Sequence, residues 1–229
     1  MNRVLLILVA LLLSFNVASA ATFGPASPSG DGGDFTFGLG YHPYDARLDN
    51  GLKMDQDTAY AQLGYNFTNN IGMYVIGGGA DTRFKTTGFD DGYRPFGGMG
   101  FKALLTGDSK PLGIGFFGQG LYFAPSEVEN PAANSKTTLV DHFQVDGGLL
   151  LQVEWDNGIL YGGPIGYLHA LTSETETNGS LTAEDELEEK DNIGSVLGVN
   201  WRAGQDMFVE LELQNKTKLT GAVNILIRF

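Results

Sequence analysis

The C-terminal end of the chain alternates apolar and polar side chains with a period of two, and no other feature restricts the fold as much. One face of residues 219–229 carries Leu219, Gly221, Val223, Ile225, Ile227 and Phe229, and the other carries Thr220, Ala222, Asn224 and Arg228. Successive side chains of a β-strand point to opposite faces of the sheet. The pattern therefore predicts a strand with one apolar and one polar side, and only Leu226 departs from it.

The same alternation recurs along the chain between clusters of turn-forming residues. It predicts about ten strands, with eight as the alternative, at 35–41, 58–67, 71–81, 96–105, 112–123, 139–155, 159–171, 193–201, 207–214 and 219–229. Such a series of short strands favours an all-β fold, and an even strand number suits an antiparallel up-and-down transmembrane β-barrel.

A soluble β-sandwich is the competing fold, since its strands alternate as well. The connections argue for the barrel, because short links at 68–70, 106–111, 156–158 and 203–206 alternate with long ones at 42–57, 82–95, 124–138 and 172–192. Short turns of such barrels face the periplasm and long loops face outward, which predicts both termini on the periplasmic side. Aromatic residues at strand ends fit the two interfacial girdles of a barrel: Tyr41, Tyr65, Phe67, Trp155, Tyr161 and Trp201.

The first twenty residues have the features of a cleavable signal peptide. Arg3 precedes an apolar run at 4–13, and Ala18-Ser19-Ala20 is a small-x-small cleavage pattern. The predicted organisation is a signal peptide at 1–20, a periplasmic N-terminal linker at 21–33 and a transmembrane barrel domain at 34–229. The chain has no cysteine, so strand pairing and packing must stabilise the fold without disulfides.

The balance of charges is acidic. The formal net charge is -13, and removal of Arg3 with the signal peptide changes it to 13 - 27 = -14. This balance argues against nucleic acid as a partner. Much of the excess lies at 174–191, which is predicted to be a solvated outer loop rather than a cation site, because it lacks the ordered ligand spacing of a calcium loop.

Charged residues on the inward faces of the strands are the candidate functional set. The pattern places seven of them in the lumen: Lys102, Asp146, Glu154, Arg202, Glu210, Glu212 and Arg228. Buried charges are costly unless they are paired, so a network of ion pairs that closes the bore is predicted, with Arg228 close to Glu210.

No catalytic residue, cofactor or metal ligand is predicted. The best protease-like motif is Asp141-His142, but neighbouring residues of a strand point to opposite faces, so the two side chains cannot meet. His42 is interpreted as a loop-edge residue and His169 as an interfacial one.

The terminal residues Val223, Ile225, Ile227 and Phe229 resemble the C-terminal signature by which the barrel-assembly machinery recognises its clients. The chain is similar in this respect to small Gram-negative outer-membrane barrels, the opacity-like, OmpA-like or YfaZ-like porin-type class. The resemblance implies location in the outer membrane, with membrane lipid, lipopolysaccharide and the assembly machinery as partners. A non-enzymatic structural or narrow-pore role is expected. The alternative is a surface adhesin or ligand-binding barrel that acts through its outer loops, and an outer-membrane hydrolase ranks below both.

Overall fold

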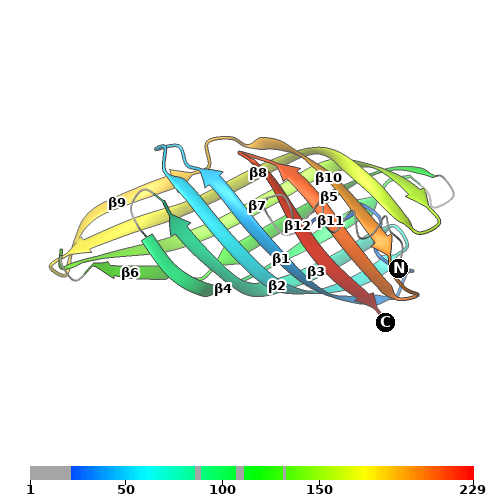
Figure 1. Cartoon of the computed structure of the whole chain (residues 1–229), viewed down its shortest axis with the longest axis horizontal. Coiled ribbons are helices and arrows are strands. Elements are labelled where there is room, and N and C mark those ends of the chain that lie inside the picture. The colour runs from blue at the N-terminus through cyan, green and yellow to red at the C-terminus, as the bar shows by residue number, and fades with distance from the viewer. Residues whose placement is uncertain (1–21, 86–88, 107–110, 131–132) are drawn as a thin grey trace, which may run out of the picture.

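The chain forms a long antiparallel β structure (Figure 1). The computed structural model describes residues 22–85, 89–106, 111–130 and 133–229, so the expected signal peptide lies outside the described residues. The strands are β1 (Phe35–Arg47), β2 (Lys53–Thr68), β3 (Ile71–Phe84), β4 (Phe89–Leu104), β5 (Leu112–Phe123), β6 (Ser126–Asn130), β7 (Ser135–Trp155), β8 (Gly158–Thr177), β9 (Ser180–Glu188), β10 (Ile193–Arg202), β11 (Met207–Asn215) and β12 (Leu219–Arg228). Within the described ranges, no helix is long and apolar enough to cross a membrane.

Ten of these strands close into an all-antiparallel up-and-down barrel, which confirms the predicted fold class and strand number. The wall runs β1-β2-β3-β4-β5-β7-β8-β10-β11-β12, and β12 pairs with β1 from Thr36↔Arg228 to Tyr41↔Val223. Closure gives every wall strand two neighbours, so the wall has no free edge in lipid. Phe229 pairs with Phe35 at what we call the terminus end of the barrel, and the opposite end is called the loop end.

The loop end is built differently from the sequence prediction, because most of the expected long loops are strands. Strands β7 and β8 continue well beyond β10, β11 and β12 (Figure 1), and β6 and β9 pair with these extensions. The acidic stretch 174–191, predicted to be a solvated loop, forms the end of β8, all of β9 and the short segment after it. Its carboxylates other than Glu189 are exposed or half-buried, since a strand can turn them outward while its backbone is paired.

The outer face of the barrel is an apolar belt. Side chains such as Leu39, Val75, Met99, Leu149 and Leu197 are each more than half exposed around the wall. Exposed aromatic residues lie at both ends of the belt, including Phe67, Trp155 and Phe229 near the terminus end and Tyr41, Tyr93 and Tyr122 toward the loop end. A wide apolar belt between two girdles of aromatic residues is the surface that suits a bilayer.

Strand β8 faces the opposite way from the interpretation drawn from its sequence. Tyr161 was expected in an interfacial girdle on the outer surface, yet it points into the lumen together with Ile165 and Tyr167, and all three are at most 4% exposed. The outward positions between them include Pro164 and Gly166. Both faces of this strand carry apolar residues, so alternation alone could not choose between them.

Candidate functional site in the barrel lumen

The beginning of the described chain lies inside the barrel. Residues 22–28, expected to be part of a periplasmic linker, run within the lumen and are called the plug segment here. Phe23 and Ala26 are fully buried, and the Phe23 ring stacks on Phe117 with 4.2 Å between centroids. These two side chains pack in one apolar cluster with residues of β5, β7, β8 and β10. The plug segment therefore supplies the apolar partner that lets Tyr161 and Ile165 face inward.

Glu212 on β11 anchors the plug segment. Its carboxylate accepts hydrogen bonds from the backbone amides of Phe23 and Gly24, at 3.1 Å for the shorter contact of each. Tyr161 donates its hydroxyl to the same carboxylate at 2.8 Å, and the Gln214 amide donates as well. A buried carboxylate is tolerated only when several donors surround it. Glu212 and the plug segment thus satisfy each other.

Glu210 contacts the plug segment one position earlier on the same face of β11. It accepts hydrogen bonds from Asn200 and Asn224 on the two neighbouring strands, each at 3.0 Å, and from the Thr22 hydroxyl at 3.3 Å. Asn224 lies directly opposite Glu210 in the strand register. The carboxylate thus links the plug segment to β10 and β12.

Gly24 is required where the plug segment passes between charged side chains. Its φ of +69° belongs to the left-handed region that side chains disfavour. A Cβ there would lie 2.4 Å from Lys102 Nζ and 2.6 Å from Glu210 Oε1. Lys102, predicted to face the lumen, is buried and lies 5.7 Å from the centre of the Tyr74 ring.

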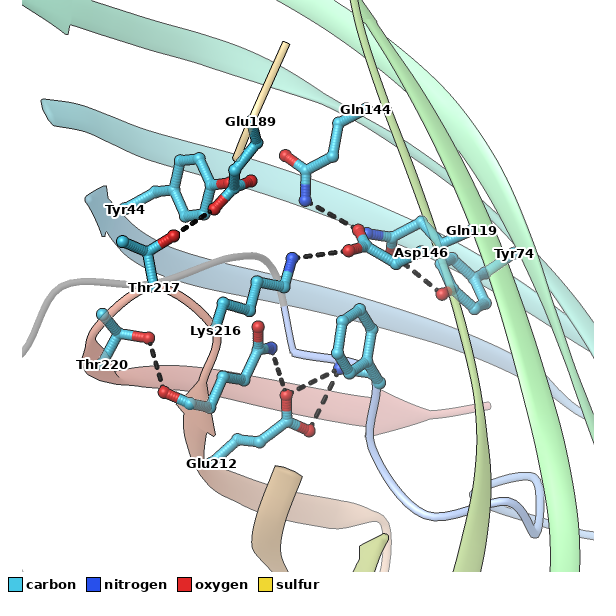
Figure 2. Close-up of polar contacts among 12 residues, drawn as sticks. Tyr44, Tyr74, Gln119, Gln144, Asp146, Glu189, Glu212, Lys216, Thr217 and Thr220 are labelled. Carbon is cyan, nitrogen blue, oxygen red and sulfur yellow. Dashed lines mark hydrogen bonds and ion pairs between the residues drawn. The ribbon is translucent and has the colours of Figure 1, made fainter. Parts of the chain in front are cut away.

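The centre of the lumen holds a buried ion pair between Lys216 and Asp146 (Figure 2). The two atoms are 2.5 Å apart, and the side chains are 1% and 0% exposed. Gln144 donates a second hydrogen bond to Asp146 at 2.7 Å. The rings of Phe23, Tyr44 and Tyr167 surround the ammonium group, with their centres 4.9 to 5.7 Å from Nζ. This set is called the Lys216 centre.

Glu189 extends the polar layer toward the loop end (Figure 2). It follows β9, outside the ten wall strands, and accepts hydrogen bonds from the hydroxyls of Tyr44 and Thr217. Burial raises the pKa of this carboxyl group above its ordinary value, although the two hydrogen bonds act in the opposite direction.

The three histidines of the chain are all buried in the lumen. His142 and His169 stack with 4.8 Å between ring centroids, and their Nε2 atoms are 2.5 Å apart. His42 contacts the Thr58 hydroxyl at 2.8 Å. The loop-edge and interfacial interpretations of His42 and His169 were therefore wrong. Among the residues that the structure describes, no group of three or more His, Asp or Glu is placed to hold a metal ion.

An apolar layer covers the lumen at the loop end. It consists of nine buried side chains and is called the apolar cap: Tyr44, Ala46, Leu48, Met54, Phe84, Phe89, Leu139, Leu171 and Leu187. Leu48 also forms a bridge to Glu189, which joins the end of β1 to the segment after β9. The cap separates the polar lumen from the space outside the loop end.

The terminus end is a polar vestibule of about 280 Å³ beside the plug segment. Glu154, Arg202 and Arg228 line it. Arg228 hydrogen-bonds Asp206 at 2.9 Å, so it does not form the pair with Glu210 that the sequence suggested. Register explains the difference, because Glu210 lies opposite Asn224, four residues from Arg228.

The seven predicted lumen charges thus fall into separate groups. Lys102, Asp146, Glu210 and Glu212 are buried, whereas Glu154, Arg202 and Arg228 lie at the vestibule. The sequence interpretation missed Lys216, because a lysine in a tight turn is normally solvated. The sequence did contain a signal for it. Lys216 lies two residues after Gln214 and so continues the inward-facing series of Glu210, Glu212 and Gln214.

Comparison with known proteins gives no family but does give a fold. No protein-family model matches the chain, and no curated protein matches it. An outer membrane channel from Pseudomonas putida F1 is similar in structure, with a TM-score of 0.51, 9% identity, and coverage of 92% of this chain and 100% of that one. The transport unit of the autotransporter AIDA-I from Escherichia coli has a TM-score of 0.35 at 10% identity, covering 86% of this chain and 89% of that one.

At 9% identity the Pseudomonas likeness concerns the fold alone. The closed barrel, the apolar belt and the aromatic residues at both ends of the belt agree with that fold. The chain therefore has the closed β-barrel fold of that outer-membrane channel, with an outer surface that suits a bilayer.

Proposed function

We propose that the chain is a non-enzymatic structural barrel of the outer membrane, of the small opacity-like or OmpA-like kind, whose narrow bore is sealed at rest. The observation that carries this proposal is the plug segment, whose Phe23 is fully buried and whose amides bind Glu212 within the lumen. A ten-stranded barrel is only modestly wider than an eight-stranded one, which side chains already fill.

Two closures in series support the proposal. The plug segment occupies the part of the lumen nearer the terminus end, and the apolar cap covers the loop end. A hydrated ion would have to shed water to pass nine buried apolar side chains, which is costly. Removal of one closure should therefore leave the other in place.

The arrangement of the histidines supports a non-enzymatic role. Asp141 is exposed on the outer face whereas His142 is buried, so the protease-like motif has no shared face. The Nε2 atoms of His142 and His169 contact each other within the lumen. A general base needs its nitrogen within hydrogen-bond reach of a substrate, and these two nitrogens face each other instead.

The proposal includes the route to the membrane. After cleavage of the signal peptide at 1–20, the barrel-assembly machinery would bind the last strand through four side chains that are all exposed: Val223, Ile225, Ile227 and Phe229. The loop end would then face outward among lipopolysaccharide, because short turns of such barrels lie on the periplasmic side.

Conductance across planar lipid bilayers tests the sealed state. Wild-type protein is expected to give no step currents, and deletion of residues 22–28 alone is expected to remain closed, because the apolar cap persists. The same deletion combined with Phe84→Ala and Leu187→Ala in the cap should open a pore. Leu149→Ala on the outer face, 58% exposed, serves as the matched control with the deletion. Large wild-type currents that admit sugars would refute the proposal.

A further inference from the structure

A cup lies at the loop end, beyond the apolar cap. Its volume is about 440 Å³, within the range of roughly 300–1,000 Å³ that is usual for small-molecule sites. The ends of β3, β4, β7 and β8 form its wall together with β6, β9 and the link between β1 and β2. None of the residues assigned to the lumen site in the preceding sections, except the outermost side chains of the cap, takes part in it.

One part of the cup wall is apolar. It contains Leu52, Phe84, Phe89, Val128 and Leu187. Phe84 and Phe89 meet edge to face, with 5.5 Å between ring centroids, and both belong to the cap. The cap thus serves as the floor of the cup, and a ligand would rest on side chains that already pack against one another.

Another part of the wall carries hydroxyl groups from two paired strands. Ser135 and Thr137 come from β7, and Ser173 and Thr175 come from β8. Thr137 lies opposite Thr175 in register, with 3.5 Å between the two hydroxyl oxygens. Asn50 and Asn130 add amide groups at the rim. Hydroxyl and amide groups can each donate and accept hydrogen bonds.

The charge of the cup is negative. Glu129 and Asp185 are its ionisable residues, and the described residues that line it include no Lys, Arg or His. Asp185 lies opposite Ser173, so it shares the inner face of the β8–β9 pair with the hydroxyl groups. A carboxylate or phosphate ligand would meet repulsion here without a compensating cation.

We propose that this cup is a binding site for an uncharged sugar ring. A sugar has an apolar C–H face and a rim of hydroxyl groups that both donate and accept, which matches an apolar floor beside a wall of Ser, Thr and Asn. The volume accommodates one or two rings, and the lack of a basic residue among the described lining residues disfavours acidic sugars. The proposal depends on the loop end facing outward and not on the sealed lumen, so conductance and sugar binding can fail independently.

Saturation-transfer NMR on the full mature chain in detergent micelles tests the proposal with glucose, maltose and glucuronate as probes. Glucose or maltose is expected to bind with a millimolar-range Kd, and glucuronate more weakly. Thr137→Val, which keeps the shape and removes the hydroxyl, should weaken neutral-sugar binding about fivefold, the effect of one hydrogen bond. Thr138→Val is the matched control, because Thr138 is the next residue on β7 and points to the other face.

Heat-modifiable migration on gels establishes that each variant is folded before binding is compared. The proposal is overturned by three results: no saturable binding of either neutral sugar, tighter binding of glucuronate than of glucose, or equal losses in Thr137→Val and Thr138→Val. Binding of longer polysaccharide but of neither small sugar would also overturn it, since the cup has room for one or two rings only.

Discussion

Removal of the buried ammonium group in the lumen should destabilise the barrel more than any single surface change. Lys216→Met keeps the length of the side chain and leaves the Asp146 carboxylate buried, with Gln144 as its remaining hydrogen-bond donor in the Lys216 centre. An exposed ion pair would contribute less than about 1 kcal/mol. Because these side chains are 1% and 0% exposed, loss of one partner is expected to cost about 3–5 kcal/mol instead.

The surroundings of the pair predict an order among the variants. Asp146→Leu leaves the Lys216 ammonium among three aromatic rings, each of which stabilises a cation by about 0.5–1 kcal/mol or more when water is excluded. Its cost should therefore be smaller than that of Lys216→Met. The double variant leaves no unpaired charge at this position and should be more stable than Lys216→Met alone.

The assay is urea-induced unfolding from lipid vesicles, followed by tryptophan fluorescence of Trp155 and Trp201 and by the loss of heat-modifiable migration. The free energies of unfolding of wild type, both single variants and the double variant form a complete cycle. A loss below about 1 kcal/mol for Lys216→Met would contradict the argument from burial. Single losses that add in the double variant would show that the two side chains are not coupled.

Four further outcomes are expected. Gly24→Ala should lower the free energy of unfolding by at least about 1–3 kcal/mol in the same urea assay, because φ is +69° and a Cβ would meet charged side chains on both sides. Arg228→Ala should cost less than about 1 kcal/mol, since its partner Asp206 is 56% exposed; a larger loss would mean that the vestibule is more tightly packed than its exposure indicates. Phe229→Ser should slow the appearance of heat-modifiable barrel in cells, and an unchanged rate would argue against recognition of the last residue. Burial raises the pKa of Glu189 in the folded state above its unfolded value, so protonation of this carboxyl group favours folding. Its contribution to the free energy of unfolding should therefore decline as the pH rises from the unfolded pKa through the folded pKa. Glu189→Gln should flatten this part of the profile of stability against pH.

Alternation along single strands predicted much of the wall correctly. Val223 and Ile225 on the apolar face of the last strand lie outside, and Asn224 on its polar face lies inside, as does Asp146 on β7, which the pattern placed in the lumen. The reason is local, since adjacent side chains of a strand must point to opposite faces whatever surrounds them. This rule also placed Glu210 and Glu212 in the lumen, where each is 1% exposed.

The rule failed where both faces of a strand are apolar or where a turn bends into the bore. Tyr161 on β8 was assigned to the lipid side because the sequence did not reveal the apolar cluster around Phe23 that awaits it inside. Lys216 was not among the predicted lumen residues because it follows the end of β11 in a turn, although it continues the inward series of that strand. In both cases the outcome depends on what fills the lumen.

The sequence by itself determined the approximate positions of the ten wall strands and the faces of most of them, because period-two patterning and short turns are properties of neighbouring residues; it did not reveal β6 and β9, which lie in the predicted loops. Only the tertiary structure decided what lies within that wall. Phe23 meets Glu212 across 189 positions in sequence, a contact that exists only once β12 has paired with β1 and the bore has its final width. The plug segment, the Lys216 centre and the cup all depend on this closure, since each joins side chains from strands that are brought together by the ring and not by the order of the chain.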